Sequence, residues 1–339
     1  MLPHTQSNTD MIRLKKLSDM LCLVCLTSVL ASCSSWIDED MSDCYPTMKR
    51  SITYQILLLT NFEPEIKEKL GKAEDTEVAK SLRQHLDGIF TDNDQQLDML
   101  FYSDHEPFEL KHHEFHAMNT NRATYTVSLP ANPYLHIATA YRRQGLNVKT
   151  ERTDNGQTAS LRQQPSQGTA EPHTSAIYTT HRTIDFSKET QDVLINLYIA
   201  NSAVALVIDP QGHQAQSVRV LSTGFATGFN IADSAYTHTT PSPIILTKQL
   251  TVDGGNEWCY CSANFPSDDN GWMFKAYVTL PNGSVTESIL SVRKPLKAGE
   301  LAIVKAYMDE EGALRTDDHQ VGISVMLNWK EGMNQDVEL

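Results

Sequence analysis

No apolar run in this 339-residue sequence is long enough to cross a bilayer, since a spanning helix needs about 20 apolar residues. Basic residues are also scarce: 28 Lys and Arg stand against 42 Asp and Glu, which gives a formal net charge of −14. An acidic chain of this kind is not drawn to nucleic acid or to anionic lipid by its charge. We therefore expect no nucleic-acid partner.

Catalytic motifs are missing as well. The sequence has no G-x-S-x-G nucleophile elbow, no phosphate-binding loop and no H-E-x-x-H pair. The strongest metal candidate is the group His112, His113 and His116, because imidazoles bind zinc. We interpret their polar segment as a solvated histidine-rich loop. We therefore expect no catalytic residue, no metal site and no cofactor, and we keep a metal-dependent hydrolase at these histidines as an alternative.

The N-terminus has the layout of a secretory signal. Arg13, Lys15 and Lys16 precede the apolar residues 20–30, and a basic patch followed by a short apolar core is typical of signal peptides. Met11, just before the basic patch, is an alternative start. We predict that residues 1–32 are a signal peptide and are removed.

The end of the apolar core carries a lipidation motif. Leu30, Ala31 and Ser32 directly precede Cys33, and this quartet resembles a bacterial lipobox. Such a cysteine carries an S-diacylglycerol group and an N-palmitoyl chain, and stable anchoring takes more than one chain. We therefore expect Cys33 to fix the protein to a membrane. An ordinary signal peptide followed by a chance cysteine is the alternative.

Residues 33–50 form an acidic tether in this interpretation. Ser34, not Asp, follows Cys33, so the familiar rule for retention in the inner membrane does not apply. Asp38, Glu39 and Asp40 come shortly afterwards. They resemble the surface-export signal of Bacteroidetes lipoproteins, and a simple solvated tether explains them equally well. We expect an outer-membrane protein that faces the cell surface.

Few cysteines remain in the mature chain. If Cys33 is acylated, only Cys44, Cys259 and Cys261 are left, so at most one disulfide can form within the chain. Cys44 with Cys259 or with Cys261 is possible in an oxidising compartment. Cys259 and Cys261 are alternate residues of an expected strand and share one face, and a bridge between those two would be strained.

The mature sequence reads mainly as strands, with one helix. Residues 77–90 have apolar residues at helical spacing, and Thr76 is a candidate N-cap. Pro281-Asn282-Gly283-Ser284 predicts a tight hairpin. Strands are expected from β-branched and aromatic content and from flanking turns at 51–60, 97–103, 123–129, 134–141, 193–200, 204–209, 217–222, 257–263, 272–280, 285–292, 300–308 and 321–329.

A polar segment divides these strands. Residues 152–175 contain almost no apolar side chains, so they do not bury enough surface to offset their ordering entropy. We predict a linker or long loop at 151–180, a β-sandwich domain at 51–150 and a second β-sandwich domain at 181–339. The predicted fold class is all-β, with two tandem sandwiches and a short helix in the first.

Two segments resemble the FimB/Mfa2 family of fimbrium anchor lipoproteins of Bacteroidales. Residues 33–44 match the start of the mature family members, with a lipid cysteine, an acidic stretch and then Cys44 before the first strand. Met41 stands where the family pattern has Leu. Residues 321–329 resemble the closing strand of the family.

The resemblance implies a fold and a role. It implies that both sandwiches are transthyretin-like, that the protein is not an enzyme, and that it anchors a fimbrium to the outer membrane and helps limit its length. The implied partners are the fimbrial shaft subunits, chiefly the major fimbrillin, joined by strand addition. The alternative is a glycan-binding surface lipoprotein of a carbohydrate uptake system, which would need an exposed line of Trp or Tyr.

Overall fold

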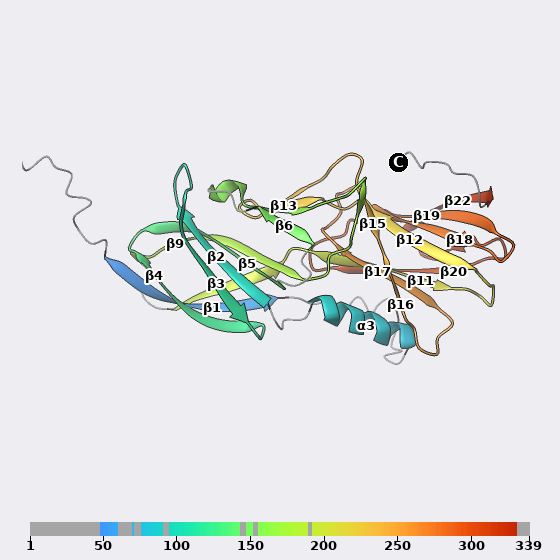
Figure 1. The fold of residues 1–339 in the computed structure, drawn as a ribbon, viewed down its shortest axis with the longest axis horizontal. Coiled ribbons are helices and arrows are strands. Elements are labelled where there is room, and N and C mark those ends of the chain that lie inside the picture. The colour runs from blue at the N-terminus through green and yellow to red at the C-terminus, as the bar shows by residue number, and fades with distance from the viewer. Residues whose placement is uncertain are drawn as a thin grey trace, which may run out of the picture. The chain divides into compact units, whose positions relative to one another are not determined.

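The structure is a computed structural model that describes residues 48–59, 70, 76–90, 95–142, 147–151, 155–188 and 192–330. The expected signal peptide, the lipobox with Cys33, and Cys44 lie outside these residues. Strands dominate the described chain and α3 (Glu77–Phe90) is its one long helix, so the all-β prediction with a short helix is confirmed (Figure 1). Residues from Lys49 onward form one compact unit.

The first sheet has seven strands in the order β3-β2-β5-β9-β10-β1-β4. β1 and β10 run parallel, and the other neighbours are antiparallel. The bounds are β1 Lys49–Leu59, β2 Gln95–Ser103, β3 Leu110–Met118, β4 Arg122–Pro130, β5 Pro133–Arg142, β9 Ile177–Asp185 and β10 Asp192–Ile199.

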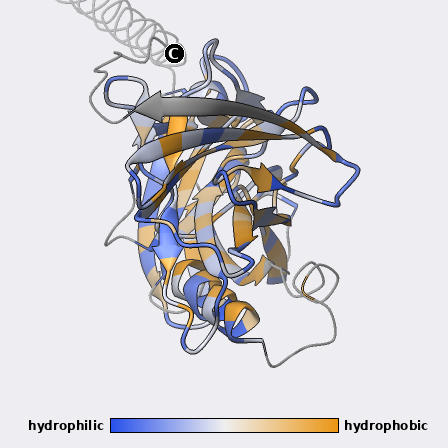
Figure 2. Ribbon diagram, turned by 90° about the vertical axis from the view of Figure 1, so that its right-hand side faces the viewer, coloured by the Kyte–Doolittle hydropathy of each residue, from blue (hydrophilic) through white to orange (hydrophobic). Residues whose placement is uncertain are grey.

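Alternation along β1 shows how this sheet forms its core. Ile52, Tyr54 and Ile56 are fully buried, because successive side chains of a strand point to opposite faces. α3 adds an apolar stripe to the same core, and Thr76 caps it by accepting a hydrogen bond from the Ala79 amide at 3.3 Å. The predicted helix and its N-cap are therefore confirmed, and α3 carries both hydrophobic and hydrophilic colours in Figure 2.

A small four-stranded sheet packs on the other face of β2, β5 and β9. Its order is β14-β13-β7-β6, and Leu161 and Phe229 from this sheet meet Leu100 and Ile137 from the first one. The bounds are β6 Val148–Glu151, β7 Ser160–Gln163, β13 Gly228–Asn230 and β14 Ala235–Thr237, with a 3₁₀ turn at Gly156–Thr158.

Residues 151–180, which the sequence predicts to be a polar linker or long loop, contain short strands. β7 and β8 (Thr169–Ala170) lie inside that range, and β9 begins there. Its few apolar residues, such as Leu161, enter a core. Its polar side chains bond to the main chain, as Gln163 Nε2 does to the Glu171 carbonyl at 2.9 Å. The first sheet also extends to Ile199, past the expected start of the second domain at 181.

The remaining strands form a sandwich of a five-stranded and a six-stranded sheet around a second core that includes Leu206, Val220 and Phe274. The strand orders are β16-β17-β11-β20-β21 and β22-β19-β18-β12-β15-β8. The bounds are β11 Ser202–Asp209, β12 Ser217–Thr223, β15 Ile244–Leu246, β16 Lys248–Leu250, β17 Trp258–Asn264, β18 Trp272–Thr279, β19 Ser284–Val292, β20 Leu301–Met308, β21 Leu314–Arg315 and β22 Val321–Lys330.

Two glycines of this sandwich adopt a positive φ at positions where the chain turns or packs closely. Gly283 has φ +79° in the turn that joins β18 to β19, so the predicted hairpin is confirmed. Gly224 has φ +101°, and a Cβ there would lie 2.8 Å from the Trp272 Cα. Both positions need glycine because L side chains rarely adopt positive φ.

Candidate functional site

Unpaired sheet edges are the feature of this fold that could bind another chain, because an edge strand offers main-chain groups to an incoming strand. Five of the edge strands are short: β8 and β21 have two residues, β14 and β16 have three, and β6 has four. Among the strands described, three edges are long, namely β3 and β4 with nine residues each and β22 with ten. These three are the candidates for strand addition.

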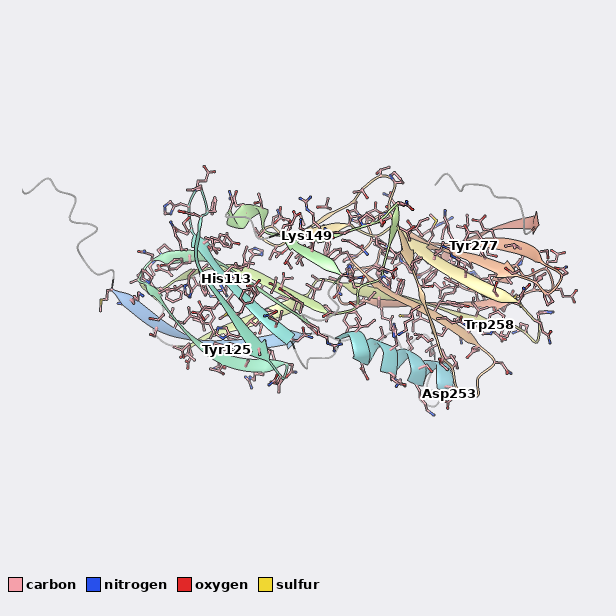
Figure 3. The ribbon with its side chains drawn as sticks, viewed as in Figure 1. His113, Tyr125, Lys149, Asp253, Trp258 and Tyr277 are labelled. Carbon is pink, nitrogen blue, oxygen red and sulfur yellow. The ribbon has the colours of Figure 1, made fainter. Side chains whose placement is uncertain are left out.

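β3 and β4 are the two edges of one sheet, and they meet near the turn that joins them. We call this region, residues 110–118 and 122–130, the β3–β4 seam. The Tyr125 hydroxyl donates a hydrogen bond to the Ala117 carbonyl at 2.9 Å. The rings of His116 and Tyr125 stack with centroids 4.2 Å apart. Figure 3 labels Tyr125 on β4 and His113 on β3. Side chains therefore cover part of both edges.

The histidine-rich segment is strand β3, so its interpretation as a solvated loop is wrong. Glu114 Oε1 bonds His112 Nε2 at 2.7 Å, and Glu114 Oε2 bonds His116 Nε2 at 2.8 Å. His113 lies on the opposite face, because it is one residue out of step, and its Nε2 bonds Asp98 Oδ1 at 2.5 Å. The alternation gives these histidines carboxylate partners that the sequence pattern alone does not show.

The same geometry separates the three histidines of the hydrolase alternative. His112 and His116 share one carboxylate on one face, and His113 is on the other. Within the described ranges, no three His, Cys, Asp or Glu side chains come together as a metal site. The arrangement therefore gives the hydrolase alternative no support.

Charge at the seam also protects it from unwanted pairing. Burial acts to raise the pKa of Glu114, but hydrogen bonds from His112 and His116 outweigh it and hold that pKa below its usual value. Glu114 is thus ionised at neutral pH. Charged residues on an edge strand, particularly ones that point inward, are a common device against edge-to-edge association.

The outer edge of β22 has a different character. β22 pairs with β19 alone among the described strands. The Arg293 amide bonds the Gln320 carbonyl at 3.3 Å, and hydrogen-bonded pairs alternate along an antiparallel ladder. Since Leu290 pairs with Ile323, the N–H and C=O of Ile323 point away from β19, toward the open edge. The sequence predicts this strand but not its place at the end of a sheet.

The cysteines give no exposed thiol in the described part of the chain. Cys259 and Cys261 are fully buried free thiols in the core beside α3, and burial raises the pKa of Cys259 to about 12. Their shared face agrees with the expected strand alternation. A disulfide from either one to Cys44, and lipidation at Cys33, concern residues outside the description and stay predictions.

Comparisons with known proteins agree on the fold. No protein-family model and no curated protein matches the sequence. A solved structure of a candidate adhesin from Bacteroides ovatus is similar, with TM-score 0.50 and 9% identity over 84% of this chain and 97% of that one. Similar too are a candidate polysaccharide-binding protein from Bacteroides thetaiotaomicron (TM-score 0.49, 8% identity, 79% and 99% covered) and the fimbrial anchor protein Mfa2 from Porphyromonas gingivalis (TM-score 0.44, 10% identity, 82% and 99% covered).

The similarity to the Bacteroides ovatus adhesin, with its TM-score of 0.50, shows a shared fold. The solved structures similar to this chain include the fimbrial anchor protein Mfa2, whose family residues 33–44 and 321–329 resemble in sequence. Among the described residues, no helix is both long and apolar enough to cross a membrane.

Proposed function

We propose that this protein is a non-enzymatic lipoprotein that anchors a fimbrium to the outer membrane and helps limit its length. The observation that carries the proposal is the ten-residue open edge of β22 in a chain whose sequence has a lipobox at Cys33. The lipid would hold one end of the chain at the membrane, and the open edge would bind a shaft subunit. The adhesin from Bacteroides ovatus, which shares the fold, is consistent with a role in adhesion.

β22 is the favoured edge because it is the least protected of the three long ones. β3 and β4 meet through Tyr125 and carry Glu114 with its histidine partners, whereas β22 has no neighbour on its outer side among the described strands. An added strand would gain main-chain hydrogen bonds there, and alternate side chains would provide specificity. A partner that occupies this edge would also end shaft growth at the anchor, since an edge accepts only one neighbour.

The glycan-binding alternative finds less support in the surface. It required an exposed line of Trp or Tyr on one face. The exposed aromatic side chains in the described part of the chain are Phe115 on β3, Tyr198 on β10 and Tyr307 on β20. They lie on three different strands and do not form a line along any one of them.

A proline substitution tests the edge. Proline at position 323 removes an N–H that faces outward and leaves the β19 ladder intact. We expect Ile323→Pro to abolish co-purification of fimbrial subunits from detergent-solubilised outer membranes, as read by mass spectrometry. Ile323→Val, which keeps the N–H, is the matched control and should retain the subunits. Retention of subunits by the folded proline variant would rule out the β22 edge.

The lipid is tested separately. Cys33→Ala should release the protein from the membrane fraction and leave fimbriae detached, while its binding to shaft subunits in solution persists. Deletion of the gene should give detached fimbriae of abnormal length by electron microscopy. Attached fimbriae of normal length in the deletion strain would contradict the anchor function itself.

A further inference from the structure

Strand β1 directly follows the N-terminal segment, and neighbouring strands hold it on both sides. Its residues 53–59 pair with β10 in parallel, and its residues 49–57 pair with β4 in the antiparallel sense. It is therefore an interior strand of its sheet, although it is the first described strand of the chain. A pull on the residues that precede β1 reaches the folded protein through this strand.

The main-chain groups of β1 are divided between its two neighbours. The Leu58 amide donates a hydrogen bond to the Asn121 carbonyl at 2.9 Å, on the side of β4. Successive residues of a strand direct their main-chain groups to opposite sides, so those of Thr53, Gln55 and Leu57 point toward β10. The ladder of seven residue pairs with β10 and that of nine pairs with β4 therefore share this one strand.

The buried side chains of β1 keep the strand from sliding between its neighbours. Ile52, Tyr54 and Ile56 are fully buried. The Tyr54 ring packs edge-on against the rings of Phe101 and His136, with centroids 6.1 Å and 5.4 Å apart. A slide of one residue would move every side chain of a strand to the opposite face of the sheet. The core therefore opposes motion of β1 along its own axis.

Two connections between this sheet and the second sandwich leave from the C-terminal end of β10. β10 ends at Ile199, and β11 of the second sandwich begins at Ser202. The segment that leads from β8 into β9 arrives at the same end, where the Ala200 amide donates a hydrogen bond to the Ile177 carbonyl at 2.7 Å. Because β1 and β10 are parallel, the N-terminal end of β1 lies at the opposite end of the pair.

We propose that β1 is a mechanical clamp, which resists a pull between the N-terminal segment and the second sandwich. Such a pull acts on β1 at its N-terminal end and on β10 at its C-terminal end, in opposite directions along the strands. All seven residue pairs between them then carry the force together, whereas pairs that are opened from one end break one after another. Forced unfolding is governed by the unfolding barrier, which rises when many hydrogen bonds must break at once. The use of this resistance to hold a fimbrium rests on the proposed function.

Single-molecule force spectroscopy on the chain without residues 1–33 compares two directions of pulling. Handles at Met48, which is 74% exposed, and at the exposed Lys294, in the loop after β19, apply the force along β1. Handles at Met48 and at the exposed Asn132, in the turn after β4, open the β1–β4 pair from one end. We expect a severalfold higher rupture force in the first direction. Equal rupture forces in the two directions would overturn the proposal.

A reversible cross-link locates the rupture. Thr53 on β1 faces Thr126 on β4 as a pair without mutual main-chain hydrogen bonds, in which Cα atoms are about 4.5 Å apart, a separation that suits a disulfide. Neither side chain is buried, so Thr53→Cys with Thr126→Cys should preserve the core.

The force is applied along β1 to this double variant in its oxidised and its reduced state. We expect the first rupture of the oxidised variant to need the higher force, and the unaltered chain, as the control, to show no difference under the same oxidant and reductant. The same force in both states of the variant would place the rupture outside β1 and refute the proposal. Neither lipid nor fimbriae enter these measurements, so their outcome is independent of the anchor function.

Discussion

The seven-stranded sheet holds histidines in two environments. His112, His113 and His116 on β3 are 33%, 27% and 26% exposed, and each bonds a carboxylate. His136, on the interior strand β5, is fully buried. Its ring stacks on Phe101 with centroids 4.3 Å apart, and its Nδ1 bonds the Leu100 carbonyl at 3.1 Å.

The comparison shows that the surroundings of a histidine decide whether it serves as a partner of a carboxylate or as a buried neutral group. On the edge strand, each imidazole has a carboxylate partner within hydrogen-bond distance. In the interior, burial disfavours the charged form and lowers the pKa of His136 to about 4 and that of His173 to about 3. Interior histidines thus act as neutral polar groups at neutral pH.

The largest expected effect is a loss of folding stability in acid, caused by two separate buried histidines, His136 and His173. Their pKa values in the folded protein lie below the usual 6.5, so the unfolded chain binds more protons, and stability present above about pH 6.5 is lost as the pH falls. Each histidine contributes about 1.4 kcal/mol per pH unit. The free energy of unfolding should fall by roughly 5 kcal/mol between about pH 6.5 and about pH 4.5, as measured by urea denaturation. A flat profile over this range would contradict the burial of both imidazoles.

The sequence predicts the long apolar strands and the helix of this fold. It does not predict the polar strands, because their partners in the sheet are not visible in the local pattern. The strands at 193–200 and 272–280, the helix at 77–90 and the hairpin at Gly283 follow from local periodicity and turn chemistry, and the structure has them. β3 and β9 were missed because HHEFH and HRTID lack apolar alternation. On β3, His113 is satisfied by Asp98 on the neighbouring strand, and His112 and His116 are satisfied by Glu114 on the same strand.

The candidate site is less visible in the sequence than the fold. The closing strand at 321–329 is predictable from its β-branched residues, but its place at an open edge depends on sheet order, which local pattern does not encode. Lipidation at Cys33, by contrast, is predicted by a short sequence motif alone and needs no knowledge of the fold.

The second prediction isolates the interior histidine on β5. His136→Leu conserves volume approximately and removes the titrating group, so the loss between pH 6.5 and about pH 4.5 should become smaller by roughly 2.5 kcal/mol. The comparison of the two pH values within one variant cancels the lost hydrogen bond to Leu100. His105→Leu is the control, because His105 is 81% exposed, and it should keep the full pH dependence.

The third prediction concerns the edge pair His113–Asp98. Asp98 is 1% exposed, whereas His113 is 27% exposed, so loss of the carboxylate breaks a half-buried pair. We expect Asp98→Ala to lower the free energy of unfolding at pH 7 by about 2 kcal/mol, below the range for fully buried pairs. Asp104→Ala removes the partner of the exposed His105 and should cost less than about 0.5 kcal/mol. Equal effects of the two substitutions would show that burial of Asp98 does not matter.

The smallest effect expected is at the β3–β4 seam. Tyr125→Phe removes the hydrogen bond to the Ala117 carbonyl and keeps the ring that stacks on His116. The variant therefore tests the contribution of this hydrogen bond while Glu114 and its histidine partners stay in place. The free energy of unfolding should fall by about 0.5–1 kcal/mol, and amide exchange along β3 should become faster near Ala117. Tyr307→Phe, on a partly exposed ring of β20, is the matched control. If both variants behave alike, the hydroxyl of Tyr125 does not close the seam, and the contrast in protection between this edge and β22 rests on Glu114 and its histidines alone.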